Sequence, residues 1–540
     1  MIIPAPPAMP TLEFRSGADA VAFLGRLPMA DPVQTHESLT RFFHALARRP
    51  LPPMEQAPVL AQAEKPLAFV QEEAARRYLG RPLPYGEQEL PLFRRTVQLW
   101  LDAADAWLAA EPPTGGDADT AAILERALFC RGMAVVEHLL ARFQIPPGLW
   151  RSFHEIFEES ERRQVADFVF QDPAGRNLSC TRAYGAVLLF DMAKPYSLRS
   201  RDLPLVWRWA RSLGQLLKVL PVEAGVAVPF VVNLAGDKPL MKALPGAIHP
   251  TSVRRLETEA LANHLRKLRR RLAEGLSPGE LQLGSDVAAA DAARLLAHLK
   301  YPWTQEAIAR PFDLGQPIGP LAVVLGYEAI HYRITGREVN RPQAAREAYQ
   351  FSRQDADRLA VFGTARDGAA SLRDAAASRY AGESWSLLEH NAGALRLHRA
   401  GPGGRVAVGQ LTAVAADPAK PESLALARIS SLMQTGDGGV MMKVKRLSGV
   451  AIGVAIQALG ANLSAQPLVG GFLIQALGED GTAAPELVMP RGWYQKQRLI
   501  SLDFHDPEVP VRRYRLEKVI FGGHDYDLVA CVADDGSYPN

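Results

Sequence analysis

The first 165 residues repeat one pattern, in which apolar side chains recur every three or four positions between short polar turns. In residues 33–48, for example, Leu39, Phe42, Phe43 and Leu46 fall on one face of an ideal helix. Similar helices are expected at residues 65–78, 91–110, 119–143 and 147–164. Because the connections between them are short, consecutive helices should be antiparallel. We therefore predict a helical domain over residues 1–165, built as a bundle or as an irregular solenoid.

The pattern is mixed over residues 166–362. Helical spacing returns at residues 203–220, 252–274 and 286–299. Residues 226–235 are instead rich in β-branched side chains, and residues 320–336 resemble a strand that leads into a helix. We predict a second, mainly helical domain here.

The pattern of hydrophobic and polar positions changes after residue 360. The small-residue stretch 363–384 is expected to be a linker. Beyond it, short β-type runs recur between turn residues, without long helical patterns. Apolar and polar positions alternate at Leu395 and Leu397 against Arg396 and His398, so one face of such strands should be buried. The predicted fold is thus α+β multidomain, with a β-barrel or sandwich over residues 385–540.

The composition argues against a strongly basic nucleic-acid-binding protein and against a disulfide-rich protein. The chain has 540 residues, and its 61 Lys and Arg nearly balance 58 Asp and Glu, for a formal charge of +3. A global field that attracts nucleic acid is therefore not expected. The three cysteines, Cys130, Cys180 and Cys531, are far apart, which argues against a disulfide scaffold. With neither a predicted membrane span nor a secretion signal, we expect a cytoplasmic protein.

Motifs that resemble catalytic sites have simpler structural interpretations. The sequence GLSPG at residues 275–279 matches a nucleophile elbow on paper, but it follows a predicted helix and not a strand. Ser277 and Glu280 are better explained as a capping box. GDGG at residues 436–439 lies between two β runs and predicts a hairpin turn. Arg266, Arg269 and Arg270 would form a solvated helix face.

The histidines give no metal-binding pattern, because His-Glu-x-x-His is absent and no three ligands have a typical spacing. We therefore predict no metal, no cofactor and no catalytic residue. An enzyme in the middle region remains an alternative, and it would need a polar pocket around Asp237, Glu328 and His331.

The β region resembles the PilZ family of bacterial signalling domains. The resemblance rests on EHNAGALRL at residues 389–397, followed by the β runs at residues 405–414, 427–433 and 439–449. Residues 65–84 and 326–336 are also similar to long bacterial proteins that end in such a domain. The resemblance implies a six-stranded barrel, and it implies cyclic di-GMP as a ligand. In the family, two upstream arginines and an Asp/Asn-x-Ser-x-x-Gly turn bind this dinucleotide.

The residues that match this family site differ from its pattern. Glu389 stands where Asp or Asn is usual, Asn391 where Ser is usual, and Ala394 where Gly is usual. Arg373 and Arg379 are separated by five residues and not by three. By resemblance, the expected ligand-binding residues are Arg373, Arg379, Glu389, Asn391 and Ala394.

The predicted function is that of a non-catalytic bacterial signalling or adaptor protein, which responds to cyclic di-GMP and acts through a protein partner. Ligand binding would then order residues 363–384. The alternative is a ligand-free scaffold with a degenerate barrel. Stacked guanines and phosphates need guanidinium groups, and a glutamate repels an anion. The departures from the family pattern therefore favour that alternative.

Overall fold

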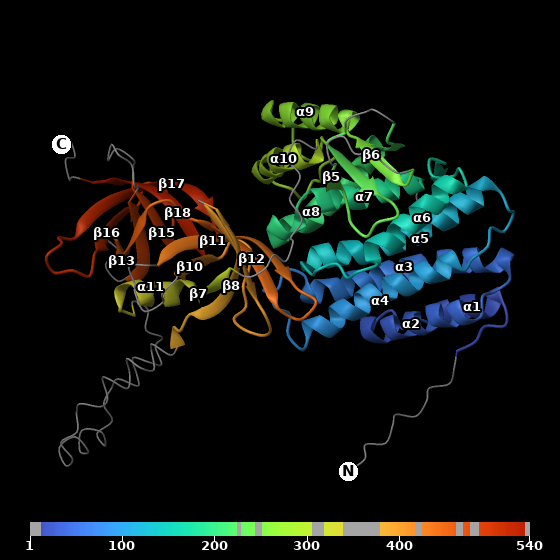
Figure 1. Cartoon of the computed structure of the whole chain (residues 1–540), viewed down its shortest axis with the longest axis horizontal. Coiled ribbons are helices and arrows are strands. Elements are labelled where there is room, and N and C mark those ends of the chain that lie inside the picture. The colour runs from blue at the N-terminus through green and yellow to red at the C-terminus, as the bar shows by residue number, and fades with distance from the viewer. Residues whose placement is uncertain are drawn as a thin grey trace, which may run out of the picture. The chain divides into compact units, whose positions relative to one another are not determined.

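The computed structural model describes residues 12–173, 175–223, 228–243, 251–304, 318–338, 379–391, 393–415, 424–460, 468–475 and 485–534. The chain divides into two compact units. One comprises Met1–Arg81 and Tyr85–Phe312, and the other comprises Pro82–Pro84 and Asp313–Asn540. In Figure 1, the first unit runs from blue to green and the β-rich unit from yellow to red.

The first unit is built mainly from helices, as the hydrophobic spacing predicts. In the described residues these are α1 (Gly17–Leu24), α2 (Pro32–Arg48), α3 (Pro53–Tyr78), α4 (Glu89–Leu108), α5 (Asp117–Ala141), α6 (Leu149–Arg162), α7 (Cys180–Met192), α8 (Leu203–Leu213), α9 (Glu259–Ala273) and α10 (Ala289–Trp303). Three short 3₁₀ turns lie at Pro195–Ser197, Ser200–Asp202 and Gly214–Leu216. Helices α2 to α5 lie side by side (Figure 1).

Helix α5 forms the centre of this unit. Most of its residues are buried on all sides, since it packs against α4, α6 and α7. Gly132 allows the close approach, because a Cβ at this position would lie 2.9 Å from a Val187 methyl group and 3.0 Å from the Phe153 ring. Nearby, the rings of Phe157 and Tyr184 stack with their centroids 4.0 Å apart. Close packing of this kind holds the helices around the candidate site in fixed positions.

Two small sheets complete the first unit. The hairpin of β1 (Phe170–Gln171) and β2 (Asn177–Leu178) precedes α7. A four-stranded sheet has the order β3-β6-β4-β5, from Lys218–Pro221, Val253–Glu257, Phe230–Asn233 and Met241–Lys242.

Two helix predictions were too long. The predicted helix at 203–220 ends at Leu213, and Lys218–Pro221 is a strand. The predicted helix at 252–274 is divided into strand β6 and helix α9, because Val253–Glu257 pairs with β3 and β4. These strands are stabilised by partners distant in the sequence, so helical periodicity did not reveal them.

The second unit contains two closed six-stranded barrels within the described residues. The first has the order β10-β11-β12-β9-β8-β7, and the second β13-β14-β15-β18-β17-β16. The first is formed by β7 (Gly319–Leu325), β8 (Glu383–Asn391), β9 (Ala394–Arg399), β10 (Leu411–Ala415), β11 (Ala425–Gln434) and β12 (Val440–Arg446). The second is formed by β13 (Val450–Ala458), β14 (Val469–Gln475), β15 (Glu486–Pro490), β16 (Leu499–Asp503), β17 (Arg512–Gly522) and β18 (Tyr526–Ala533).

The structure confirms an α+β multidomain fold and a β-rich carboxy-terminal region. The predicted strand and helix at 320–336 are β7 and α11 (Tyr327–Thr335), and β7 closes the first barrel although the sequence placed it in the middle domain. The expected alternation in β9 is present, with Leu395 and Leu397 buried. Most of the predicted linker lies outside the described residues, and Glu383 already belongs to β8. The division at residue 165 stays a prediction.

Helix α11 joins the two barrels. The Tyr327 hydroxyl donates to the carbonyl oxygens of Gly470 (2.9 Å) and Val488 (3.2 Å). The His331 Nε2 lies 3.1 Å from the carbonyl oxygen of Val454. Because a Cβ at Gly470 would lie 2.8 Å from the His331 ring, this glycine allows the helix to approach the strand closely. Residues from α11 and both barrels share one apolar cluster.

Candidate functional site: an arginine-lined pocket

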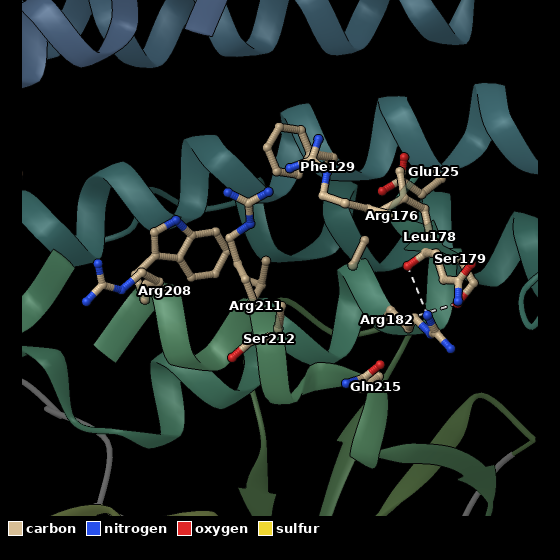
Figure 2. A pocket seen from close by; sticks show the side chains of 15 residues that line it. Glu125, Phe129, Arg176, Leu178, Ser179, Arg182, Arg208, Arg211, Ser212 and Gln215 are labelled. Atoms are coloured by element: carbon tan, nitrogen blue, oxygen red, sulfur yellow. Dashed lines mark hydrogen bonds between the residues drawn. The ribbon is translucent and has the colours of Figure 1, made fainter. Parts of the chain in front are cut away.

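A cavity with a volume of about 640 Å³ lies in the first unit. Its walls come from α5, the β1–β2 hairpin, the start of α7, and α8 with the 3₁₀ turn after it (Figure 2). The lining residues are Glu125, Phe129, Arg176, Asn177, Leu178, Ser179, Arg182, Ala183, Ala186, Val187, Trp207, Arg208, Arg211, Ser212 and Gln215. This volume is typical of small-molecule sites. We call this cavity the arginine pocket, after its four arginines.

Arg211 is the basic group with the fewest protein partners in the arginine pocket. Its guanidinium lies over the Phe129 ring, 5.4 Å from the centroid, and 6.0 Å from that of Trp207. Among the described residues it has no hydrogen bond or ion pair. Burial, and secondarily the charge of Arg176, lowers the pKa of Arg211. A bound anion would offset both effects, since it would give this guanidinium a partner and screen the repulsion.

Arg176 is held in position by the hairpin turn that precedes it. The Asp172 carboxylate accepts hydrogen bonds from the Arg176 backbone N–H (2.8 Å) and from its Nε (2.7 Å). Figure 2 shows the Arg176 side chain extending toward Phe129, beside Glu125, while Arg211 approaches from α8. The two guanidinium groups therefore face the same part of the cavity.

The other two arginines lie toward the ends of the arginine pocket. Arg182 donates to the carbonyl oxygen of Asn177 (2.9 Å), and its backbone N–H is capped by the Ser179 side chain (3.3 Å) at the start of α7. Arg208 pairs with Asp286 at 2.9 Å. Arg208 thus has a carboxylate partner, whereas Arg182 forms no ion pair within the part of the chain that the structure describes.

The chemistry of this arrangement suits a planar, anionic ligand. Guanidinium groups bind phosphate oxygens in a bidentate manner. The rings of Phe129 and Trp207 provide flat apolar surfaces beside these cations, and nucleobases stack on such surfaces. The arginine pocket therefore has the features of a nucleotide-binding site.

Three of the five residues predicted by resemblance, Glu389, Asn391 and Ala394, lie at one barrel turn, and the side chains of the first two have local partners. Glu389 forms an ion pair with Arg396 of the neighbouring strand. The Asn391 side chain accepts from the backbone N–H groups of Gly393 (3.1 Å) and Ala394 (2.8 Å), so it closes the β8–β9 turn.

Ala394 is buried in β9. Arg379 lies 3.8 Å from Glu338 across its ion pair, with an exposed side chain. Arg373 lies outside the described residues. The turn thus brings Glu389, Asn391 and Ala394 together, and whether any of the five residues binds a ligand stays a prediction.

The three residues considered for catalysis belong to two different units. Asp237 belongs to the first unit, where its carboxylate accepts from the backbone N–H groups of Gly148 (2.6 Å) and Arg151 (3.0 Å) at the start of α6. Glu328 and His331 belong to the second unit. In the part of the chain that the structure describes, no cluster of His, Cys, Asp and Glu is arranged to hold a metal. No helix there has the length and apolar character needed to cross a bilayer.

The arginine pocket is not among the sites predicted from the sequence. One signal was present in residues 207–211, where tryptophans alternate with arginines in the order Trp-Arg-Trp-Ala-Arg. Helical spacing puts Trp207 and Arg211 on one face, and Trp209 is turned into the core, where its indole N–H donates to Leu283 (2.8 Å). Basic and aromatic residues on one helix face are typical of nucleotide contacts.

Part of the first unit is similar to a known protein family. No curated protein and no solved structure matches the chain. A protein-family model matches less than half of the chain, and the match ends before the barrels. Residues 18–222, which include every residue lining the arginine pocket, are similar to the family described as "Cyclic-di-GMP receptor FimW, N-terminal domain".

Proposed function

We propose that this protein is a non-catalytic signalling receptor that binds cyclic di-GMP in the arginine pocket and passes the signal to a protein partner. The observation that carries the proposal is the convergence of Arg176 and Arg211 beside Phe129, within the region similar to a cyclic-di-GMP receptor. Cyclic di-GMP has two phosphates and two guanines. The cations would bind the phosphates, and the rings would stack on the bases.

The barrel turn is the rival location for the ligand. Its Glu389 already pairs with Arg396, and its Asn391 already caps the turn. A ligand there would have to replace these contacts, and Glu389 would repel its phosphates. The arginine pocket is therefore the stronger location.

Isothermal titration calorimetry with cyclic di-GMP tests the proposal. Arg211→Ala should weaken binding by about 10- to 100-fold, the effect of losing one charged hydrogen-bonding group. Arg162→Ala is the matched control, because Arg162 is an exposed arginine of α6 that pairs with Glu159 outside the pocket. It should bind as the wild type does.

Two results would contradict the proposal. Absence of binding to the wild-type chain would leave the ligand-free scaffold as the better account. Loss of binding in Arg379→Ala, with Arg211→Ala unaffected, would move the ligand to the barrel.

A further inference from the structure

A second cavity adjoins the arginine pocket and has a volume of about 280 Å³. The two cavities share Glu125, Phe129, Arg176, Leu178 and Arg211. The remaining walls come mainly from α3, α4 and α5 and are largely apolar and aromatic, with Trp100 and Trp107 among them. We call this cavity the inner cavity. It would accept a flat ring whose attached phosphate stays against the arginines.

Glu125 is the acidic group of the shared wall, and it lacks a complete set of hydrogen-bond partners among the described residues. It is 3% exposed, and its Oε2 has no hydrogen-bond partner in the described structure. Arg126 Nη1 lies 3.5 Å from this oxygen, which is an ion-pair distance without hydrogen-bond geometry. A buried carboxylate oxygen without a hydrogen bond costs free energy, and a ligand with N–H donors would recover it.

The neighbouring arginines do not supply the hydrogen bond that Glu125 Oε2 lacks. Arg126 Nε lies 2.8 Å from Glu64 Oε1, so Arg126 already interacts with a second carboxylate. Burial is the main reason that the pKa of Glu125 is raised to about 7, and Arg126, Arg176 and Arg211 lower it only in part. Glu125 therefore remains the acceptor that faces both cavities.

We propose that the inner cavity is a base subsite that selects guanine over adenine, with the Glu125 carboxylate accepting hydrogen bonds from the guanine N1–H and 2-amino groups. This inference rests on the proposed function, since the phosphates attached to the base would lie against Arg176 and Arg211. Guanine offers two adjacent donors on this edge. Adenine has an unprotonated N1 and no 2-amino group, so the carboxylate would meet a lone pair in place of a donor.

Selectivity among three cyclic dinucleotides tests the subsite in the wild-type chain. Calorimetry at about pH 8, above the pKa of Glu125, should give the order cyclic di-GMP, cyclic di-IMP, cyclic di-AMP. Hypoxanthine keeps the N1–H and lacks the 2-amino group, so cyclic di-IMP should be intermediate. The preference for cyclic di-GMP over cyclic di-AMP should be about 10- to 100-fold, as for one bidentate contact to a base.

Glu125→Gln tests the residue itself. Its amide would turn an N–H₂ donor toward a guanine donor, so binding of cyclic di-GMP should fall by about 10-fold or more. Binding of cyclic di-AMP should be unchanged or stronger, since an amide matches adenine. Glu155→Gln is the matched control, because Glu155 is an exposed glutamate that pairs with Arg151 on α6.

The outcomes separate this inference from the proposed function. If the wild type binds all three dinucleotides equally and Arg211→Ala abolishes binding, the guanine subsite is wrong and the receptor proposal stands. If the wild type binds none of them, both are wrong. If Glu125→Gln keeps the full guanine preference, Glu125 does not read the base.

Discussion

The buried carboxyl of Glu125 should make the stability of the first unit depend on pH. Its pKa is raised from 4.5 to about 7, chiefly by burial. The folded state therefore binds this proton more tightly than the unfolded state does. The stabilisation that comes from this proton is fully present below about pH 4.5 and is lost as the pH rises through about 7. The gap between the two pKa values corresponds to about 3 kcal/mol.

Glu125→Gln removes this titration without changing the shape of the side chain. We expect the free energy of unfolding of the wild type to fall between pH 5 and pH 8, and that of the variant to fall by about 3 kcal/mol less. Some dependence should remain, because burial also raises the pKa of Glu137 and Asp191 to about 7.

Chemical denaturation followed by tryptophan fluorescence suits this test, since most of the tryptophans lie in the first unit. Glu155→Gln, at an exposed position, serves as the control and should follow the wild type. If Glu125→Gln loses as much stability as the wild type over this pH range, Glu125 does not bind its proton in the way that its burial implies.

Three substitutions test packing and local hydrogen bonds. Gly132→Ala should destabilise the first unit by about 1–3 kcal/mol, because the new methyl group would crowd Val187 and Phe153. Thermal unfolding should therefore show a lower Tm. An unchanged Tm would mean that the helices have room to adjust. Tyr327→Phe should cost the second unit about 1 kcal/mol, because it removes the one hydroxyl proton that is shared between the Gly470 and Val488 carbonyl oxygens of the second barrel. Chemical denaturation measures this loss, and no change would show that water replaces the hydroxyl at no cost. Asn391→Ala should loosen the β8–β9 turn and increase amide hydrogen exchange there, because two backbone N–H groups lose their acceptor. The affinity for cyclic di-GMP, measured by calorimetry, should be unchanged. A weaker affinity would support the barrel site.

Local patterns in the sequence predicted much of the fold. The helix at 33–48 was found because Leu39, Phe42 and Leu46 share a buried face, which is a property of the helix alone. The carboxy-terminal strands were found for a similar reason, since alternation in β9 reports burial of one face. Both signals are contained within a few consecutive residues.

Features that depend on distant pairing were not predictable in this way. Strand β7 closes the first barrel by pairing with β8 and β10, although a long segment separates β7 from β8. Strand β6 was hidden at the start of an apparent helix, because only its pairing with β3 and β4 identifies it. Whether the β region was one unit or two stayed open, since barrel closure has no local signature.

The candidate site was not predictable from the sequence for the same reason. Glu125, Arg176 and Arg211 come from α5, the β1–β2 hairpin and α8, so no short motif contains them. The resemblance to a barrel family predicts a ligand-binding turn at residues 389–394, where Asn391 caps the turn and Glu389 pairs with the neighbouring strand. Only tertiary packing brings the arginines beside Phe129.

Amide hydrogen exchange with and without cyclic di-GMP is the decisive test of whether the ligand binds in the arginine pocket, because it compares the pocket with the barrel turn in one experiment. We expect slower exchange in residues 176–187, from β2 into the first turns of α7, and in residues 207–215, from α8 into the 3₁₀ turn that follows it. The exchange rates of residues 389–396, at the barrel turn, should be the same with and without the ligand, because the ligand does not contact them. Protection confined to the barrel turn, with none along α7 and α8, would contradict the account.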